Sequence, residues 1–199
     1  PAVQARLEGF AATFLPGTGP VLARRAWIQA HGCDGLPLIG LALTAAVNIA
    51  VIFAYSRVLK HRALWDLVAM GVWGVSMAMV GFDPHDPRGW RLAALLGLLS
   101  MVTESVQVLR DQPSDAAAGV RTTAVVLGVS TTAWMARAFV LAAAGYAAWA
   151  IHPAGAVLAL GVLVKLTPET ANRAWDQLRV LFGATWLGPV SYTHLRAHE

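Results

Sequence analysis

The chain consists of long apolar runs separated by short polar segments. A bilayer core about 30 Å thick needs roughly 20 mostly apolar residues to be crossed by one helix. Runs that meet or approach this length predict about six membrane-spanning helices, at residues 36–58, 64–82, 90–109, 131–151, 154–166 and 175–190. The pattern therefore predicts an all-α fold, a polytopic helical bundle in a lipid bilayer.

The two ends of the chain depart from this pattern. Residues 1–35 contain only short apolar patches, interrupted by prolines and glycines, and they predict no clear element. Residues 190–199 break abruptly from the composition before them, and we expect them to be a non-native tail. We therefore expect one membrane domain at residues 36–189, between an unreadable segment and this tail.

The composition agrees with a membrane protein. The chain is 57% hydrophobic and only 13% charged, and a soluble domain of this length needs more polar surface. Its net charge of +4 comes from basic residues scattered singly between apolar runs, with no basic stripe or recognition motif. This distribution argues against nucleic acid as a partner.

The basic residues also predict an orientation. Cytoplasmic loops of membrane proteins carry an excess of Lys and Arg. One set of loops holds most of these residues, whereas the opposite side has Arg88 and Arg91. The richer set is expected to face the cytoplasm of a bacterial inner membrane, and it consists of Arg57, Lys60, Arg62, Arg110, Arg121, Lys165 and Arg173.

Three carboxylates stand near the end of the third apolar run. Glu104 and Asp111 are seven residues apart, so a helix places them on one face with about 20° of drift. Gln107 lies on the same stripe. Pro113 is expected to force the residue before it out of helical geometry, so that the chain turns and Asp115 folds back toward the other two.

The loop that follows contains a glycine and two threonines. Gly119 is expected to give the loop freedom, and Thr122 and Thr123 could cap the next helix. Asp66, at the start of the second apolar run, is expected to be an N-terminal helix charge that could also order the loop holding Lys60.

These acids predict a cation site. Acids that follow a membrane span are most often solvated loop charges, but Glu104 lies inside the span, where an ionised group costs a few kcal/mol without a partner. Three acids close together repel each other, and a cation relieves that repulsion. Oxygen ligands without cysteine or paired histidine favour magnesium over zinc. Glu104, Asp111 and Asp115 are therefore the predicted metal ligands.

Two blocks of this sequence resemble one known family. After Glu104, the segment 111–128 reads D-x3-D-x3-G-V-R-T-T-A-V-V-L-G, and it is similar to the second aspartate-rich motif of the UbiA intramembrane prenyltransferases. Residues 54–74, AYSRVLKHRALWDLVAMGVWG, resemble the family's Tyr-Ser-x-x-x-Lys segment. The resemblance covers roughly residues 36–189.

The resemblance implies a fold and a reaction. Family members have nine membrane spans around a central cavity, of which this chain would supply about six. Magnesium ions hold the diphosphate of an isoprenoid donor, and the allylic cation left by diphosphate departure is captured by a small acceptor, commonly an electron-rich aromatic ring. The implied reaction is therefore magnesium-dependent prenyl transfer, a step in quinone or lipid biosynthesis.

The resemblance also implies roles for single residues. Asp111 and Asp115 match the motif's metal-binding aspartates, and Lys60 matches a lysine that binds the diphosphate as a point charge. The implied substrate-binding set adds Tyr55, Ser56, Gln107, Arg121 and Arg137. Arg137 could instead be a snorkelling residue at a helix end.

One part of the family pattern is missing. The first motif, of the form N-D-x2-D-x3-D, does not occur in this sequence. The chain thus looks like the carboxy-terminal two-thirds of an enzyme, and we expect it to bind metal weakly and not to turn over on its own. Two other classes of function remain: a transporter or channel whose path Glu104 and Arg137 would line, and a catalytically inactive membrane scaffold.

Overall fold

Every regular element in the described part of the chain is helical. The computed structural model describes residues 36–79 and 87–196, with side chains described for 42–79 and 87–185. The element order is α3 (Leu36–Arg57), the 3-10 helix η1 (Leu59–His61), α4 (Trp65–Met79), α5 (Pro87–Ala117), α6 (Thr123–Leu127), α7 (Val129–Ala150), the 3-10 helix η2 (Pro153–Leu163) and α8 (Ala171–Arg196). The predicted all-α fold is confirmed, while the segment 1–35 lies outside the described residues.

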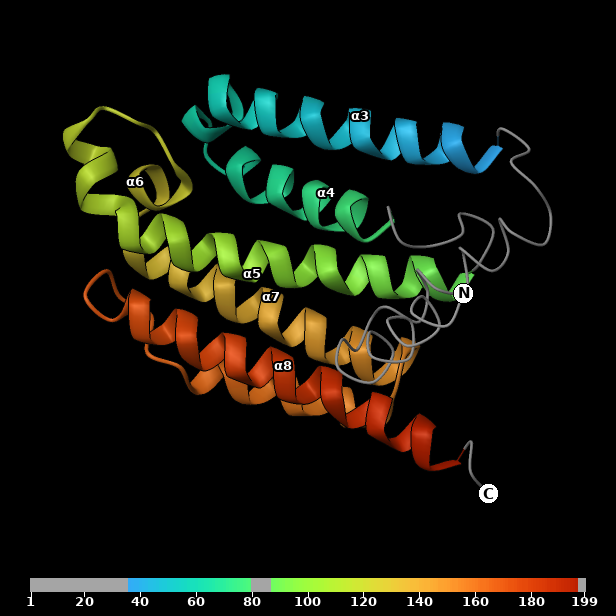
Figure 1. Cartoon of the computed structure of the whole chain (residues 1–199). Helices are drawn as coiled ribbons and strands as arrows, with labels where there is room; N and C mark the ends of the chain where they lie inside the picture. The colour runs from blue at the N-terminus through green and yellow to red at the C-terminus, as the bar shows by residue number, and fades with distance from the viewer. Residues whose placement is uncertain (1–35, 80–86, 197–199) are drawn as a thin grey trace, which may run out of the picture.

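The long helices form one bundle with α5 at its centre. Helix α5 packs against α4 on one side and against α7 and α8 on the other, and α3 contacts α4 (Figure 1). The short α6 lies at one end of the bundle, beside the carboxyl end of α5 (Figure 1). The main core lies between α5, α7 and α8, and its buried side chains include Val102, Val106, Leu109, Val140 and Leu178.

The apolar runs correspond to these elements, with two differences. Helices α3, α4 and α7 begin and end close to the predicted spans. The run at 154–166 forms the 3-10 helix η2 instead of a membrane-spanning α-helix. A 3-10 helix rises about 2.0 Å per residue, so this segment still extends about 22 Å along α7. Among the described residues, α5 is the one helix long and apolar enough to cross a membrane, and three shorter apolar helices accompany it.

The second difference concerns the end of α5. The prediction that the chain leaves the helix at Pro113 is wrong, because α5 continues through Pro113 to Ala117. What ends the helix is Gly119, whose φ of +71° is the left-handed conformation that glycine adopts without strain. The Gly119 amide donates to the Ala116 carbonyl, and the Val120 amide donates to the Asp115 carbonyl. This pair of bonds is a Schellman motif.

Glycines bring α4 and α5 into close contact. A Cβ atom added to Gly74 would lie 2.8 Å from the Leu96 carbonyl oxygen, and one added to Gly97 would lie 3.0 Å from the Gly71 carbonyl oxygen. The two helices run in opposite directions, so the amino end of α4 lies beside the carboxyl end of α5 (Figure 1). This packing determines which loops meet at that end.

The loops predicted to share one side of the membrane do lie at one end of the bundle. These are the loops between α3 and α4, between α5 and α6, and between η2 and α8 (Figure 1). The basic residues of the richer set are therefore gathered at this end. Which side of a membrane that end faces stays a prediction.

Candidate functional site

One face of α5 presents the three carboxylates named above. Asp115 belongs to α5 itself, four residues after Asp111, so it reaches that face without any reversal of the chain. Glu104, Asp111 and Asp115 are separated by seven and four residues, which places all three on a single helical stripe. The expected alignment is therefore present, although the expected turn that would produce it is not.

Glu104 is paired with Tyr55 of α3. The Tyr55 hydroxyl donates a hydrogen bond of 2.6 Å to Glu104 Oε1, and the Glu104 residue is only 2% exposed. An acid at this depth needs a partner, and the partner comes from 49 residues earlier in the chain. Two residues that the sequence selected independently are thus in direct contact.

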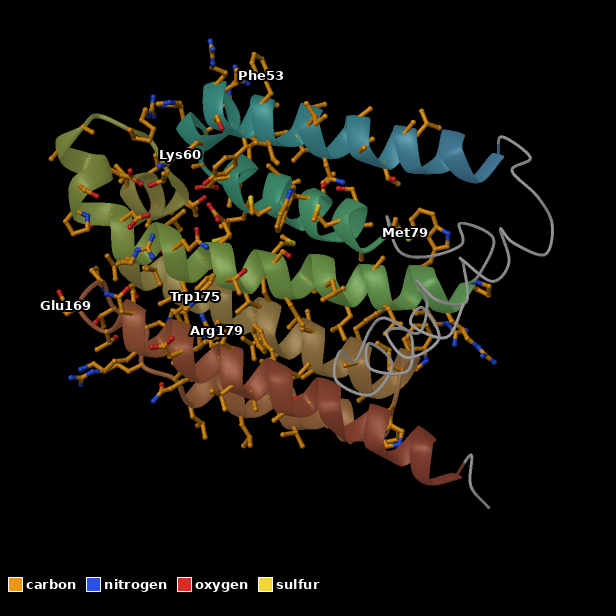
Figure 2. The ribbon with its side chains drawn as sticks, viewed as in Figure 1. Phe53, Lys60, Met79, Glu169, Trp175 and Arg179 are labelled. Atoms are coloured by element: carbon orange, nitrogen blue, oxygen red, sulfur yellow. The ribbon has the colours of Figure 1, made fainter. Side chains whose placement is uncertain are left out.

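Asp115 is paired with Lys60. Lys60 Nζ lies 3.6 Å from Asp115 Oδ1, and the two side chains are 35% and 10% exposed. Figure 2 shows Lys60 above the carboxyl end of α5, next to α6. The second carboxylate oxygen, Oδ2, is buried and has no hydrogen-bond partner within the described residues. Leaving a buried acceptor unpaired costs about 1–3 kcal/mol, so this oxygen has the capacity to receive a ligand.

Asp111 is paired with its neighbour Arg110. The guanidinium donates from Nε to Oδ1 at 2.7 Å and from Nη2 to Oδ2 at 3.0 Å. Both side chains are more than a third exposed, so this surface pair contributes little and can open at low cost. Each of the three acids therefore has its own polar or cationic partner, which relieves the repulsion that the sequence predicted.

The remaining predicted substrate ligands are less closely gathered. Ser56 is exposed and donates to the Ile52 carbonyl of its own helix, and Arg121 is exposed in the loop after α5. Gln107 is partly buried on α5. Arg137 Nε donates to the Val162 carbonyl at 3.2 Å, and its guanidinium stacks 5.2 Å from the centre of the Trp134 ring. The hydrogen bond joins α7 to η2, whereas Trp134 belongs to α7 itself.

The donor set fits a divalent metal held partly by a substrate. In residues 36–79 and 87–196, no three His, Cys, Asp or Glu side chains form a group that could hold a metal ion by themselves. Magnesium is usually bound through one or two carboxylates together with substrate phosphates, so a three-acid cage is not required. The unpaired Asp115 Oδ2 and the exposed Asp111 carboxylate are hard oxygen donors of the required kind. Their assignment to a metal stays a prediction.

Sequence reasoning missed the role of two buried residues at this end. Asp66 is fully buried, and its Oδ2 accepts a 2.7 Å hydrogen bond from the Thr123 amide. Thr122 stands at the predicted N-cap position of α6, but its side chain makes no capping bond, and the Thr123 hydroxyl is directed to Asp66 instead. The closeness of Asp66 to Lys60 in the sequence suggested that Asp66 orders the Lys60 loop. It did not indicate that Thr123 is the hydrogen-bond partner of Asp66.

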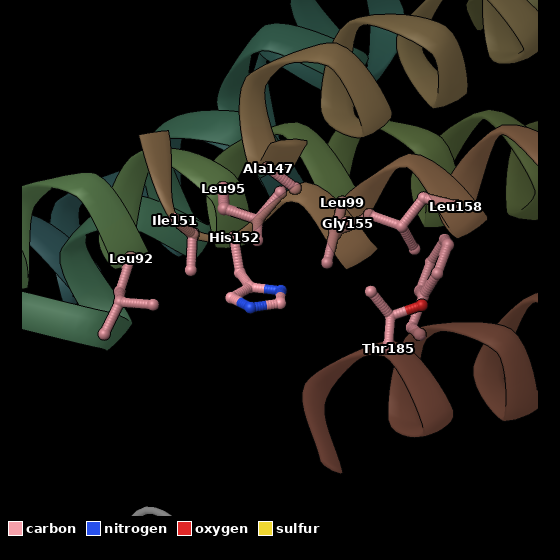
Figure 3. A pocket seen from close by; sticks show the side chains of 10 residues that line it. Leu92, Leu95, Leu99, Ala147, Ile151, His152, Gly155, Leu158 and Thr185 are labelled. Carbon is pink, nitrogen blue, oxygen red and sulfur yellow. The ribbon is translucent and has the colours of Figure 1, made fainter. Parts of the chain in front are cut away.

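A separate apolar pocket of about 140 Å³ lies at the opposite end of the bundle. Leu92, Leu95, Leu99 and Leu158 line it, and the His152 ring and the Thr185 side chain also point into it (Figure 3). Leu95 precedes Asp115 by 20 residues on α5 and Glu104 by nine, so at 1.5 Å per residue it lies about 30 Å along the helix from Asp115 and about 14 Å from Glu104. The pocket is therefore well separated from the pair formed by Lys60 and Asp115.

Comparison with models of protein families found a match. The family model described as the UbiA prenyltransferase family matches residues 36–188, which is most of the chain. Neither the curated proteins nor the solved structures gave a match. The matched range includes all nine residues predicted to form the site.

Proposed function

The chain belongs to the UbiA prenyltransferase family, whose members are integral membrane proteins, and from that membership we propose a specific function for it. We propose that it moves an isoprenoid chain from a prenyl diphosphate to a small acceptor, commonly an aromatic one, with magnesium. The active site would lie at the end of the bundle that holds Lys60 and Asp115, facing the cytoplasm of a bacterial inner membrane.

The observation on which this proposal rests is the meeting of Lys60 with Asp115. The two residues are 55 positions apart in the sequence, yet their charged groups are 3.6 Å apart. A primary ammonium binds phosphate oxygens as a point charge, and a carboxylate beside it holds the divalent ion that such phosphates carry. A cation next to an acid with one unpaired oxygen favours the interpretation as a diphosphate–metal site over the interpretation as solvated loop charges.

Each group would have a distinct task. Lys60 would bind the diphosphate directly, and the oxygens of Asp111 and Asp115 would hold magnesium. When bound, magnesium neutralises negative charge that develops on the departing diphosphate. Glu104 precedes Asp111 by seven residues on α5, so at 1.5 Å per residue it lies about 10 Å further into the bundle than Asp111. There it would hold the Tyr55 hydroxyl in a fixed orientation at the wall where the substrate lies.

The apolar surface of the bundle supports the membrane setting. Ile49 is 70% exposed, Phe53 62%, and Trp134 67%. Large apolar side chains exposed in such numbers mark contact with lipid or with further helices. An isoprenoid chain would reach the site through the same apolar surroundings, which also exclude water from a reactive allylic cation.

The proposal is tested by binding of farnesyl diphosphate. Binding is the better first readout, because the sequence contains only the second of the family's two acidic motifs. The protein in detergent micelles is titrated with farnesyl diphosphate, with and without Mg²⁺. We expect Mg²⁺ to tighten binding, and we expect Asp115→Asn to raise Kd at least tenfold, since charge-assisted contacts contribute about 1.5–3 kcal/mol.

The matched control is Asp176→Asn on α8. This substitution also removes one carboxylate from a helix, here an exposed one outside the site, and it should leave Kd unchanged. If Asp115→Asn binds as wild type does, with the same Mg²⁺ dependence, the prenyltransferase assignment of these residues is wrong. An inactive scaffold or a transporter would then be the better description.

A further inference from the structure

The carboxylate of Asp66 has no assigned role in the site proposed above. It is buried, and both of its oxygens accept hydrogen bonds. It lies in the first turn of α4 and is 0% exposed. Its Oδ1 accepts from the Leu67 amide at 2.9 Å and from the Thr123 hydroxyl. Its Oδ2 accepts from the Thr123 amide at 2.7 Å. With three donors in place, Asp66 is not itself available to a metal or a phosphate.

Thr123 extends this contact to a second backbone segment. Its hydroxyl donates to Asp66 and accepts a 2.7 Å hydrogen bond from the Leu64 amide. Leu64 has a φ of +72°, a left-handed conformation that costs a non-glycine residue about 1–2 kcal/mol. Such a conformation persists only when the surroundings impose it. We call the bonded set of Asp66, Thr123 and the Leu64 amide the Asp66–Thr123 clamp.

The clamp joins the two segments that hold the charges of the proposed site. Lys60 belongs to η1, four residues before Leu64, and Asp115 lies eight residues before Thr123. Between these anchor points and the clamp there is little chain, so the clamp restricts how far the two segments can separate. The Schellman turn at Gly119 fixes the path from Asp115 to Thr123 on the other side.

Resting on the proposed function, we infer that Asp66 and Thr123 are positioning residues for the diphosphate. They do not touch the substrate. They hold the loop of Lys60 against the end of α5, so that its ammonium group and the Asp115 carboxylate meet the diphosphate together. Their effect on binding is therefore exerted through Lys60.

The test is a double-mutant cycle on farnesyl diphosphate binding in the presence of Mg²⁺. Thr123→Val keeps the shape of the side chain but removes the hydroxyl that links Asp66 to Leu64. We expect it to raise Kd about tenfold, because Lys60 is no longer held in place. Thr123→Ser restores the hydroxyl and should return Kd to within about twofold of wild type. Thr131→Val, on the exposed face of α7, is the matched control and should have no effect.

The readout that separates positioning from general loss of structure is the Lys60→Met background. There, Thr123→Val should raise Kd by less than about twofold, since the residue through which it acts is gone. Asp66→Asn keeps the volume and one acceptor oxygen, so it provides a second variant if Thr123→Val does not fold. It should show the same dependence on Lys60.

The experiment distinguishes failure of the proposed function from failure of this inference. If wild-type protein does not bind farnesyl diphosphate, the proposed function falls and this inference falls with it. If wild type binds but the folded clamp variants keep wild-type Kd, only the inference is wrong. An equal loss of affinity in the Lys60 and Lys60→Met backgrounds would also overturn it, because the effect would then not pass through Lys60.

Discussion

The hydrogen bond between Tyr55 and Glu104 should contribute substantially to holding α3 near α5. Tyr55→Phe removes this hydrogen bond and leaves the aromatic ring in place. The bond is 2.6 Å long, within the range of about 2.5–2.7 Å found for hydroxyl donors to carboxylates. Bonds of this type contribute about 1.5–3 kcal/mol net. Glu104 is almost completely buried, so water cannot readily replace the lost donor.

We therefore expect Tyr55→Phe to lower the free energy of unfolding by about 1.5–3 kcal/mol. For a chain of this size, about 2–4 °C of Tm accompanies each kcal/mol, which gives a decrease of about 3–12 °C. The measurement is reversible unfolding in mixed detergent micelles, followed by circular dichroism. Tyr146→Phe is the matched control, because the Tyr146 ring packs edge-on against Trp149 and its hydroxyl has no hydrogen bond within the described residues.

The same substitution in a Glu104→Leu background tests whether Glu104 is the partner of Tyr55. In Glu104→Leu, the acceptor is absent, and Tyr55→Phe should then cost less than about 0.5 kcal/mol. The reasoning is refuted if Tyr55→Phe destabilises no more than Tyr146→Phe. It is refuted equally if the loss is the same with leucine at position 104, since the stabilising contact of Tyr55 would then lie elsewhere.

Three glycines give further predictions. Gly128, between α6 and α7, has φ +84° and ψ 160°, a conformation open essentially to glycine alone, so Gly128→Ala should cost about 1–3 kcal/mol. Gly145→Ala in the middle of α7, where nothing lies within 4 Å of the added Cβ, should be neutral or slightly stabilising, and a clear loss of stability would contradict this. Gly74→Ala should cost about 1–3 kcal/mol in the same unfolding assay, because its Cβ would clash with Ser100 Oγ and lie 2.8 Å from the Leu96 carbonyl oxygen. A wild-type unfolding free energy for Gly74→Ala would mean that α4 and α5 are not in close contact.

The helices could be predicted from the sequence because apolar runs of membrane length are a local signal. The end of α5 was misplaced because two local signals competed there. Pro113 suggested a break, but the helix loses only one backbone bond at a proline, and Ser114 Oγ donates to the Asp111 carbonyl one turn back. The glycine six residues later supplies the cap that ends the helix.

The site could be predicted only as a set of residues. Spacing alone placed Glu104, Asp111 and Asp115 on one face of a helix, because helical periodicity is a property of neighbours in sequence. Their partners could not be read in the same way. Tyr55 is 49 residues from Glu104, and Asp66 is 57 residues from Thr123. The first contact depends on how the bundle places α3 near α5, and the second on how it places α4 beside α6.

The claim that Asp115 belongs to a metal–diphosphate site is tested most directly by magnetic resonance with Mn²⁺ in place of Mg²⁺. With farnesyl diphosphate bound, the electron spin of Mn²⁺ should show phosphorus hyperfine coupling, which requires metal and phosphate to be in contact. We expect this coupling in wild type and in Glu169→Gln, whose carboxylate is exposed before α8, and its loss in Asp115→Asn. Absence of the coupling in wild type, or its persistence in Asp115→Asn, would contradict the site.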